Sequence, residues 1–276
     1  ADLLMPGWRW KFWLVYQVEK FPWVQVPAGE IGVVIAQVGL SLPIGAKSAI
    51  YKKEYGNFGN LKDFVANGGQ KGVQRPVLPP GSLAPFHPIG FLVLTKKKAF
   101  GVPVDRDLKW TISKEGRVSA STFGLRPEQL EVVRIQPEPT STGKIIDMIG
   151  IVTTLDGDPI PAGDIASRLG GYEDVTELEK SAADDFRLIE TVMSNKNGLH
   201  NNYQDFQAFL DHGGTIGLQH DPLLYGAFNL NPFLVSVEKA PMLVIEQGQV
   251  AVVKAYVGLP TVDTSGSDFK FGSLVR

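Results

Sequence analysis

The side chains best suited to chemistry in this 276-residue chain are its histidines and the aspartates near them. His200, His212 and His220 fall in one stretch. The aspartates of that stretch are Asp205, Asp211 and Asp221. Imidazole and carboxylate groups are common ligands of divalent metals, but this spacing matches no compact zinc signature, such as two histidines one helical turn apart. We therefore interpret these histidines as turn or surface residues and expect no metal site.

Other catalytic frameworks are also missing from the sequence. Because there is no cysteine, the sequence excludes a cysteine nucleophile, a thiolate metal site and a disulfide. Neither a G-x-S-x-G nucleophile elbow nor a G-x-x-x-x-G-K-[ST] phosphate loop occurs. Paired acids such as Asp156 and Asp158 are more typical of turns than of acid–base catalysis. We expect a protein without enzymatic activity and without a cofactor.

The charge of the chain argues against nucleic acid as a partner. The net charge is −2, whereas binding to phosphates needs a concentrated basic surface. The densest basic run is 96–98, three lysines that we interpret as a solvated strand end. Frequent glycine and proline, with 30 and 19 residues, favour short strands and many turns over long helices.

An aromatic and basic segment near the N-terminus is the strongest candidate for a binding surface. Its members are Trp8, Arg9, Trp10, Lys11, Phe12, Trp13 and Tyr16. Trp and Tyr favour the headgroup layer of a membrane, and Arg and Lys can extend their charged ends toward water beside them. The alternative is a strand that packs its aromatic side chains on a core. No run of about 18 apolar residues is present. Because the chain begins at Ala1 rather than at Met, we expect a preceding segment, a membrane anchor, that is missing from this chain.

Comparison of the chain with itself reveals an internal repeat. Residues 61–81, LKDFVANGGQKGVQRPVLPPG, align without a gap on residues 206–226, FQAFLDHGGTIGLQHDPLLYG. The alignment superposes Gln74 on Gln219 and a Gly-Gly pair on a Gly-Gly pair. Glycine and proline at repeated positions are typical of turns. The residues that we expect at structural turns are Gly69, Gly72, Pro80, Gly81, Gly214, Gly217 and Gly226.

A second motif also recurs along the chain. The sequence EIGVVIAQVGL at 30–40 returns as QVAVVKAYVGL at 249–259, and a weaker copy begins at Met148. These copies are rich in β-branched residues and apolar on both faces, which is typical of buried strands. The predicted strands are 31–38, 149–155 and 250–257.

Together the two motifs predict a small, β-rich α+β unit. It begins with the buried strand and continues with a short helix, 60–66 or 205–211, that ends at Gly-Gly. A polar strand, a turn and an apolar strand complete it. In the second copy the two motifs lie farther apart, and apolar residues recur between them at helical spacing. We expect an inserted amphipathic helix there, at about 175–194.

These motifs divide the chain into four parts. In order, they are a membrane-proximal segment (1–19), a first unit (20–135), a second unit (136–240) and the start of a third, truncated unit (241–276). The third unit stops before any Gly-Gly motif, so we expect the natural chain to continue.

The repeated motifs resemble a known family. The stretch GGQKGVQRPVLPPGSLAPFHPIGFLVLT, residues 68–95, resembles the signature of the SPFH/band 7 superfamily, which includes flotillin, prohibitin and stomatin. Residues 213–237 are a poorer copy, with Tyr225 where proline is usual. Residues 26–45 are similar to a strand and hairpin that recur in large bacterial flotillin-like proteins.

This resemblance implies a fold of tandem SPFH-like units and a non-enzymatic role. Members of the superfamily are anchored by an N-terminal membrane segment and oligomerise into rings or cages. They organise membrane microdomains or enclose other membrane proteins. For this chain the resemblance implies copies of itself, membrane lipids and a further membrane protein as partners, and units on the cytoplasmic face. The alternative is a regulatory subunit that docks to a membrane protease or transporter.

Overall fold

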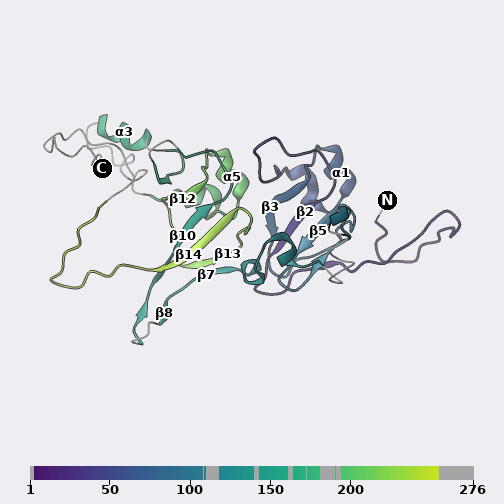
Figure 1. Ribbon diagram of the computed structural model, residues 1–276, viewed down its shortest axis with the longest axis horizontal. Helices are drawn as coiled ribbons and strands as arrows, with labels where there is room; N and C mark the ends of the chain where they lie inside the picture. The colour runs from purple at the N-terminus through teal and green to yellow at the C-terminus, as the bar shows by residue number, and fades with distance from the viewer. Residues whose placement is uncertain are drawn as a thin grey trace. The chain divides into compact units, whose positions relative to one another are not determined.

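The computed structural model describes residues 3–107, 109, 118–139, 143–160, 164–171, 173–180, 190 and 194–254. They form more strand than helix, which confirms the prediction of a β-rich α+β protein (Figure 1). The chain divides into two compact units. The first comprises Ala1–Val132 with Asn229–Phe233, and the second comprises Val133–Phe228 with Leu234–Arg276.

The first unit is built around a four-stranded antiparallel sheet in the order β3-β2-β5-β6. Its strands are β2 (Gly32–Ala36), β3 (Gly72–Leu78), β5 (Phe91–Leu94) and β6 (Ala99–Phe100). A separate strand pair joins β1 (Val24–Gln25) to β4 (Leu83–Ala84). The helices are η1 (Lys53–Phe58), α1 (Leu61–Ala66), η2 (Ala120–Phe123) and η3 (Pro127–Leu130).

The second unit also has a four-stranded sheet, in the order β11-β12-β10-β14. Its strands are β10 (Met148–Thr154), β11 (Ala166–Ser167), β12 (Gly217–Gln219) and β14 (Val235–Pro241). Two strand pairs lie outside this sheet: β7 (Val133–Ile135) with β13 (Gly226–Phe228), and β8 (Glu138–Pro139) with β9 (Ile145–Ile146). The helices are α3 (Glu173–Lys180), η4 (Asn197–His200) and α5 (Phe206–Asp211).

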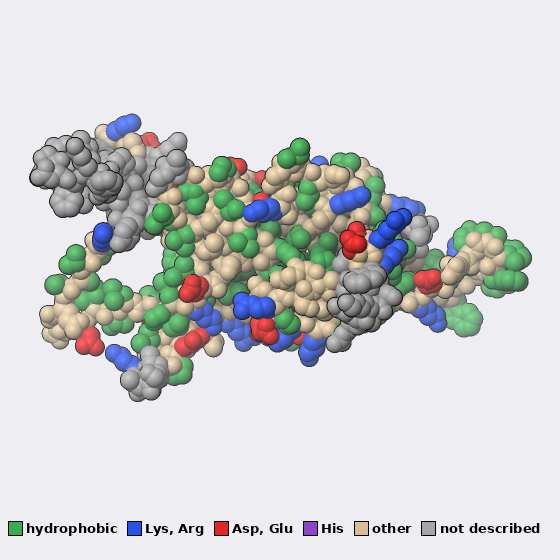
Figure 2. All heavy atoms as spheres, in the orientation of Figure 1, with side chains coloured by type: hydrophobic (Ala, Val, Ile, Leu, Met, Phe, Trp, Pro, Cys, Tyr) green, Lys and Arg blue, Asp and Glu red, His purple; other side chains and the backbone are tan. Residues whose placement is uncertain are grey.

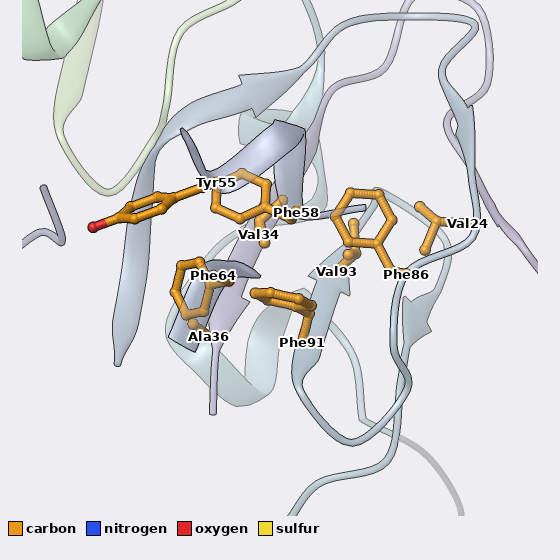
Figure 3. Packing of buried hydrophobic residues seen from close by; sticks show 9 residues of the cluster. All are labelled: Val24, Val34, Ala36, Tyr55, Phe58, Phe64, Phe86, Phe91 and Val93. Carbon is orange, nitrogen blue, oxygen red and sulfur yellow. The ribbon is translucent and has the colours of Figure 1, made fainter. Parts of the chain in front are cut away.

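The predicted strands β2 and β10 are the central strands of their sheets. Val33 and Val34 of β2 are fully buried on opposite faces. One face carries a second core of Ile31, Leu94 and Leu130. The other face carries an aromatic cluster, in which the rings of Phe58, Phe64 and Phe86 surround Phe91 at centroid distances of 5.5, 5.1 and 6.0 Å (Figure 3). The prediction of a strand buried on both faces is therefore confirmed for β2, whereas in β10 only alternate residues, Gly150, Val152 and Thr154, are buried.

The two predicted helices that end at Gly-Gly are also confirmed, as α1 and α5. Asn60 caps α1 by accepting a hydrogen bond from the Lys62 N–H, and Asp205 caps α5 by accepting one from the Ala208 N–H. Both helices span only about two turns, so they depend on tertiary packing for their stability. That packing comes from Phe64 and Phe209, which are completely buried.

Two other predicted segments are described only in part. The inserted helix predicted at 175–194 begins as α3, and residues 181–189 and 191–193 lie outside the described residues. The strand predicted at 250–257 is wrong for 250–254, which form no strand and are exposed. Among the described residues no neighbouring strand pairs with this segment, and a strand needs such a neighbour for its backbone hydrogen bonds.

Candidate functional site

The aromatic and basic segment, residues 8–16, is exposed along its whole length. Trp8, Trp10 and Trp13 have relative exposures of 105, 94 and 78%. The alternative in which these rings pack on a core is therefore wrong. Figure 2 shows hydrophobic side chains covering the N-terminal segment. Exposed tryptophans in one short segment are a candidate contact for a partner or a membrane.

A hydrogen-bonded turn orders residues 12–16 of this segment. The N–H groups of Val15 and Tyr16 both donate to the Phe12 carbonyl, at 3.0 and 3.1 Å. The Lys11 ammonium lies 4.8 Å from the centroid of the Tyr16 ring, within cation–π range. Arg9 and Lys11 are exposed beside the tryptophans. The segment therefore offers apolar rings and positive charge together, the combination that suits the headgroup layer of a bilayer.

The predicted turn glycines form the same corner in both units. Gly68 and Gly213, which follow α1 and α5, have φ of 80° and 78°. A Cβ on the next residue, Gly69 or Gly214, would lie 2.5 or 2.3 Å from the ring of Phe64 or Phe209. The glycine pair therefore ends each helix and lets the backbone pass against a buried phenylalanine.

A buried glutamine braces each corner. The Gln74 side-chain amide donates to the carbonyls of Gln70 and Gly72, both at 2.9 Å. Gln219 makes the corresponding bonds to Thr215 and Gly217, at 2.9 and 3.0 Å. The repeated glutamines thus satisfy backbone carbonyls at a corner, which is an architectural role.

Of the remaining predicted turn residues, Gly72 and Gly217 match between the two units, whereas Gly81 and Gly226 differ. Gly72 and Gly217 begin β3 and β12 with φ of 106° and 107°. Pro80 and Gly81 form a turn. The turn predicted at Gly226 is instead an extended residue, because Gly226 begins β13 and pairs with Ile135.

The histidines and aspartates that the sequence analysis considered as metal ligands, and interpreted as turn or surface residues, do not come together as a metal site. His212 and His220 are exposed, whereas His200 is buried in η4. Within the described ranges no three His, Asp or Glu side chains are placed to hold a metal ion. Asp205 caps α5, and Asp221 accepts a hydrogen bond from the Lys196 N–H.

His200 belongs to a buried polar cluster that is specific to the second unit. Its Nδ1 accepts a hydrogen bond from the Tyr203 N–H at 2.7 Å, and the Tyr203 hydroxyl donates to the Asp221 carbonyl at 2.9 Å. Burial lowers the pKa of His200 to about 4, although the Asp221 charge opposes this shift. The repeat places Tyr55 at the corresponding position of the first unit, where it is buried among aromatic rings. This position of the repeat therefore carries an imidazole base, His200, in the second unit and a phenol, Tyr55, in the first.

Sequence reasoning missed a left-handed turn that precedes both α1 and α5. Gly56, Asn57 and Phe58 have φ of 54°, 51° and 63°. The repeat-equivalent residues, Asn201 to Tyr203, have φ of 47°, 55° and 61°. Asparagine and glycine tolerate this conformation. The alignment of Gly56-Asn57 with Asn201-Asn202 in the two repeats could therefore have predicted this turn. The turn directs Phe58 or Tyr203 into the core.

Comparison with protein-family models, with curated proteins and with solved structures finds no match for the chain in any of the three. In the part of the chain that the structure describes, no helix combines the length and the apolar character needed to cross a bilayer.

Proposed function

We propose that this protein is a membrane-attached scaffold without catalytic activity, built from tandem SPFH-like units. The observation that carries the proposal is the exposure of Trp8, Trp10 and Trp13 beside Arg9 and Lys11. Exposed tryptophan leaves a large apolar area in water, and the headgroup layer covers such rings while the polar tips stay hydrated. Segment 8–16 then lies at the membrane surface.

The scaffold role is supported by the duplication of one architectural unit. Both units place a central buried strand, a capped two-turn helix, a Gly-Gly corner and a bracing glutamine in the same order. Repeated units side by side form heterologous contacts, which generate closed rings when the rotation closes. We propose a homo-oligomeric ring or cage that organises a membrane microdomain or encloses membrane proteins.

The attachment is tested by removing the exposed rings. Replacing Trp8, Trp10 and Trp13 together by serine lowers the vesicle-bound fraction of the chain, with the partition coefficient falling roughly tenfold or more. The reason is that serine offers no ring to the headgroup layer. Flotation with vesicles of phosphatidylcholine and phosphatidylserine measures the change.

The control variant removes apolar side chains from other exposed positions. Leu40, Ile44 and Leu243 are exposed by 62, 108 and 80% and lie outside segment 8–16. Their joint replacement by serine is expected to leave the partition coefficient within about twofold of the parent. An equal loss in both variants would contradict a membrane contact through segment 8–16.

The assembly is tested by the mass and shape of the chain on vesicles and after extraction in mild detergent. Negative-stain electron microscopy is expected to show closed rings or domes of many copies. A monodisperse monomer on the vesicles would refute the scaffold. A small complex with one different membrane protein would support the alternative, a regulatory subunit of a protease or transporter.

A further inference from the structure

An aromatic groove lies in the first unit next to the segment that leads out of residues 8–16. Phe21 and Pro22 line it from that segment, Phe86 and Pro88 line it from the chain before β5, and Phe100 lines it from β6. Phe21 and its neighbour Trp23 are each 40% exposed. The apolar surface of the N-terminal segment therefore continues onto the folded unit.

The lysine run 96–98 forms the tip of the hairpin between β5 and β6, and Lys98 contacts a residue that lines this groove. The backbone N–H and the hydroxyl of Thr95 both donate to the Lys98 carbonyl, at 2.9 and 2.8 Å, and close the hairpin turn. The Lys98 ammonium lies 4.6 Å from the centroid of the Phe100 ring. Because Phe100 also lines the groove, positive charge and aromatic surface meet at this point.

The charge at this rim is available to an outside partner. Lys96 is paired with Glu131, but Lys97 and Lys98 are exposed and make no ion pair within the part of the chain that the structure describes. Arg9, Lys11 and Lys20 precede the groove, against a single acidic residue, Glu19, in the segment from residue 3 to residue 23. The surface is thus basic although the whole chain has a net charge of −2.

We propose that this surface, formed by Phe21, Trp23, Lys97, Lys98 and Phe100, binds the surface of a membrane that contains anionic phospholipid. The two ammonium groups pair with headgroup phosphates and carboxylates, while Phe21 and Trp23 enter the headgroup layer. This inference rests on the proposed membrane attachment, and it adds the lipid class and a second contact on the folded unit. Each lysine near an anionic surface contributes favourably, whereas a zwitterionic surface gives no such gain.

The experiment compares vesicles of phosphatidylcholine alone with vesicles of phosphatidylcholine and phosphatidylserine, using the full chain. The parent chain is expected to bind the anionic vesicles more tightly. The double variant Lys97→Gln, Lys98→Gln is expected to lose a large part of this excess, while Arg9, Lys11 and Lys20 keep the rest. Its affinity for the anionic vesicles is expected to fall roughly tenfold and its affinity for the zwitterionic vesicles to stay unchanged. Both lysines are exposed at a hairpin tip, so the variant is expected to fold, and its circular dichroism checks this.

A matched control is the double variant Lys52→Gln, Lys53→Gln, which removes two adjacent exposed lysines that do not line the groove. It is expected to keep most of the preference for anionic vesicles. An equal loss in this control, or no loss in the Lys97 and Lys98 variant, overturns the inference. Binding that still depends on Trp8, Trp10 and Trp13 would then leave the proposed attachment standing. A parent chain that binds neither vesicle overturns both.

Discussion

Alanine at Gly39 is expected to destabilise the first unit by roughly 3–5 kcal/mol. The added Cβ would lie 2.2 Å from the Gly69 carbonyl oxygen and 2.9 Å from its carbon, and the φ of Gly39 is +118°. Both neighbours are backbone atoms, so no side-chain rotation relieves the contact. A shift of the chain would break the hydrogen bond from the Leu40 N–H to the Gly69 carbonyl, which is 2.8 Å long.

The control for backbone strain alone is Gly45→Ala. Gly45 has a φ of +90°, but nothing lies within 4 Å of an added Cβ. Its cost is expected to be about 1 kcal/mol. Urea unfolding followed by circular dichroism compares the variants, and equal costs for Gly39→Ala and Gly45→Ala would contradict the steric argument.

The repeat supplies an internal test of the same contact. Gly157 is the equivalent residue of the second unit, with a φ of +143° and an added Cβ at 2.7 Å from the Gly214 carbonyl oxygen. Asp158 pairs with Thr215 there as Leu40 pairs with Gln70 in the first unit. Hydrogen exchange resolved by mass spectrometry is expected to show faster exchange in α5 for Gly157→Ala and in α1 for Gly39→Ala.

The corner glycines show what the sequence reveals about this fold. Gly69 and Gly214 were identified because a glycine that must touch a ring recurs wherever the unit recurs. Buried strands and helices that end at Gly-Gly were predicted for a similar reason, since apolar periodicity and glycine ends are local signals. Such signals need no knowledge of distant pairing.

Pairings between distant segments could not be predicted in this way. Residues 229–233 belong to the first unit, where the Asn231 side chain donates to the Gln74 carbonyl at 2.9 Å. Val133–Ile135 pair with β13 in the second unit, although the sequence placed them at the end of the first. Neither segment differs from its neighbours in the order of its apolar and polar residues. The composition and the hydrophobic periodicity of these segments therefore do not reveal which distant segment each one contacts.

The candidate site was predictable to a similar extent. The aromatic and basic character of segment 8–16 is visible in the sequence because its members are adjacent. The groove is not, since Phe21, Phe86 and Phe100 come from three separate segments. The sequence predicts a solvated strand end for the lysine run 96–98, and the structure places Lys98 at the tip of a hairpin and over the ring of Phe100. A role for Lys98 in binding depends on this contact with Phe100, which the fold brings beside Phe21.

Acid is expected to weaken the second unit before the first, because of His200. The unfolded pKa of histidine is about 6.5, and burial lowers the pKa of His200 in the folded unit to about 4. The unfolded chain therefore binds the proton more readily. The contribution of His200 to the free energy of unfolding is therefore fully present above about pH 6.5. It falls as the pH drops toward 4, by roughly 3 kcal/mol in total.

The charges around His200 do not reverse this sign. Asp221 and Asp205 favour the protonated ring and His212 disfavours it, but burial outweighs them. Burial raises the pKa of Asp221, but hydrogen bonds from His220 and from the Lys196 N–H outweigh burial and lower that pKa overall. The contribution of Asp221 is therefore lost at a lower pH, below the range in which His200 acts.

The measurement is hydrogen exchange of α1 and α5 across pH 4 to 7, corrected for the intrinsic exchange rate. Protection of α5 is expected to fall with pH more steeply than that of α1, because Tyr55 occupies the equivalent position in the first unit. His200→Gln removes the titrating ring, so it is expected to lower protection of α5 at pH 7 and to flatten its decline in acid. His212→Gln, at the exposed C-cap position of α5, is expected to keep the decline. If the decline persists in His200→Gln, another group in the second unit controls its acid stability.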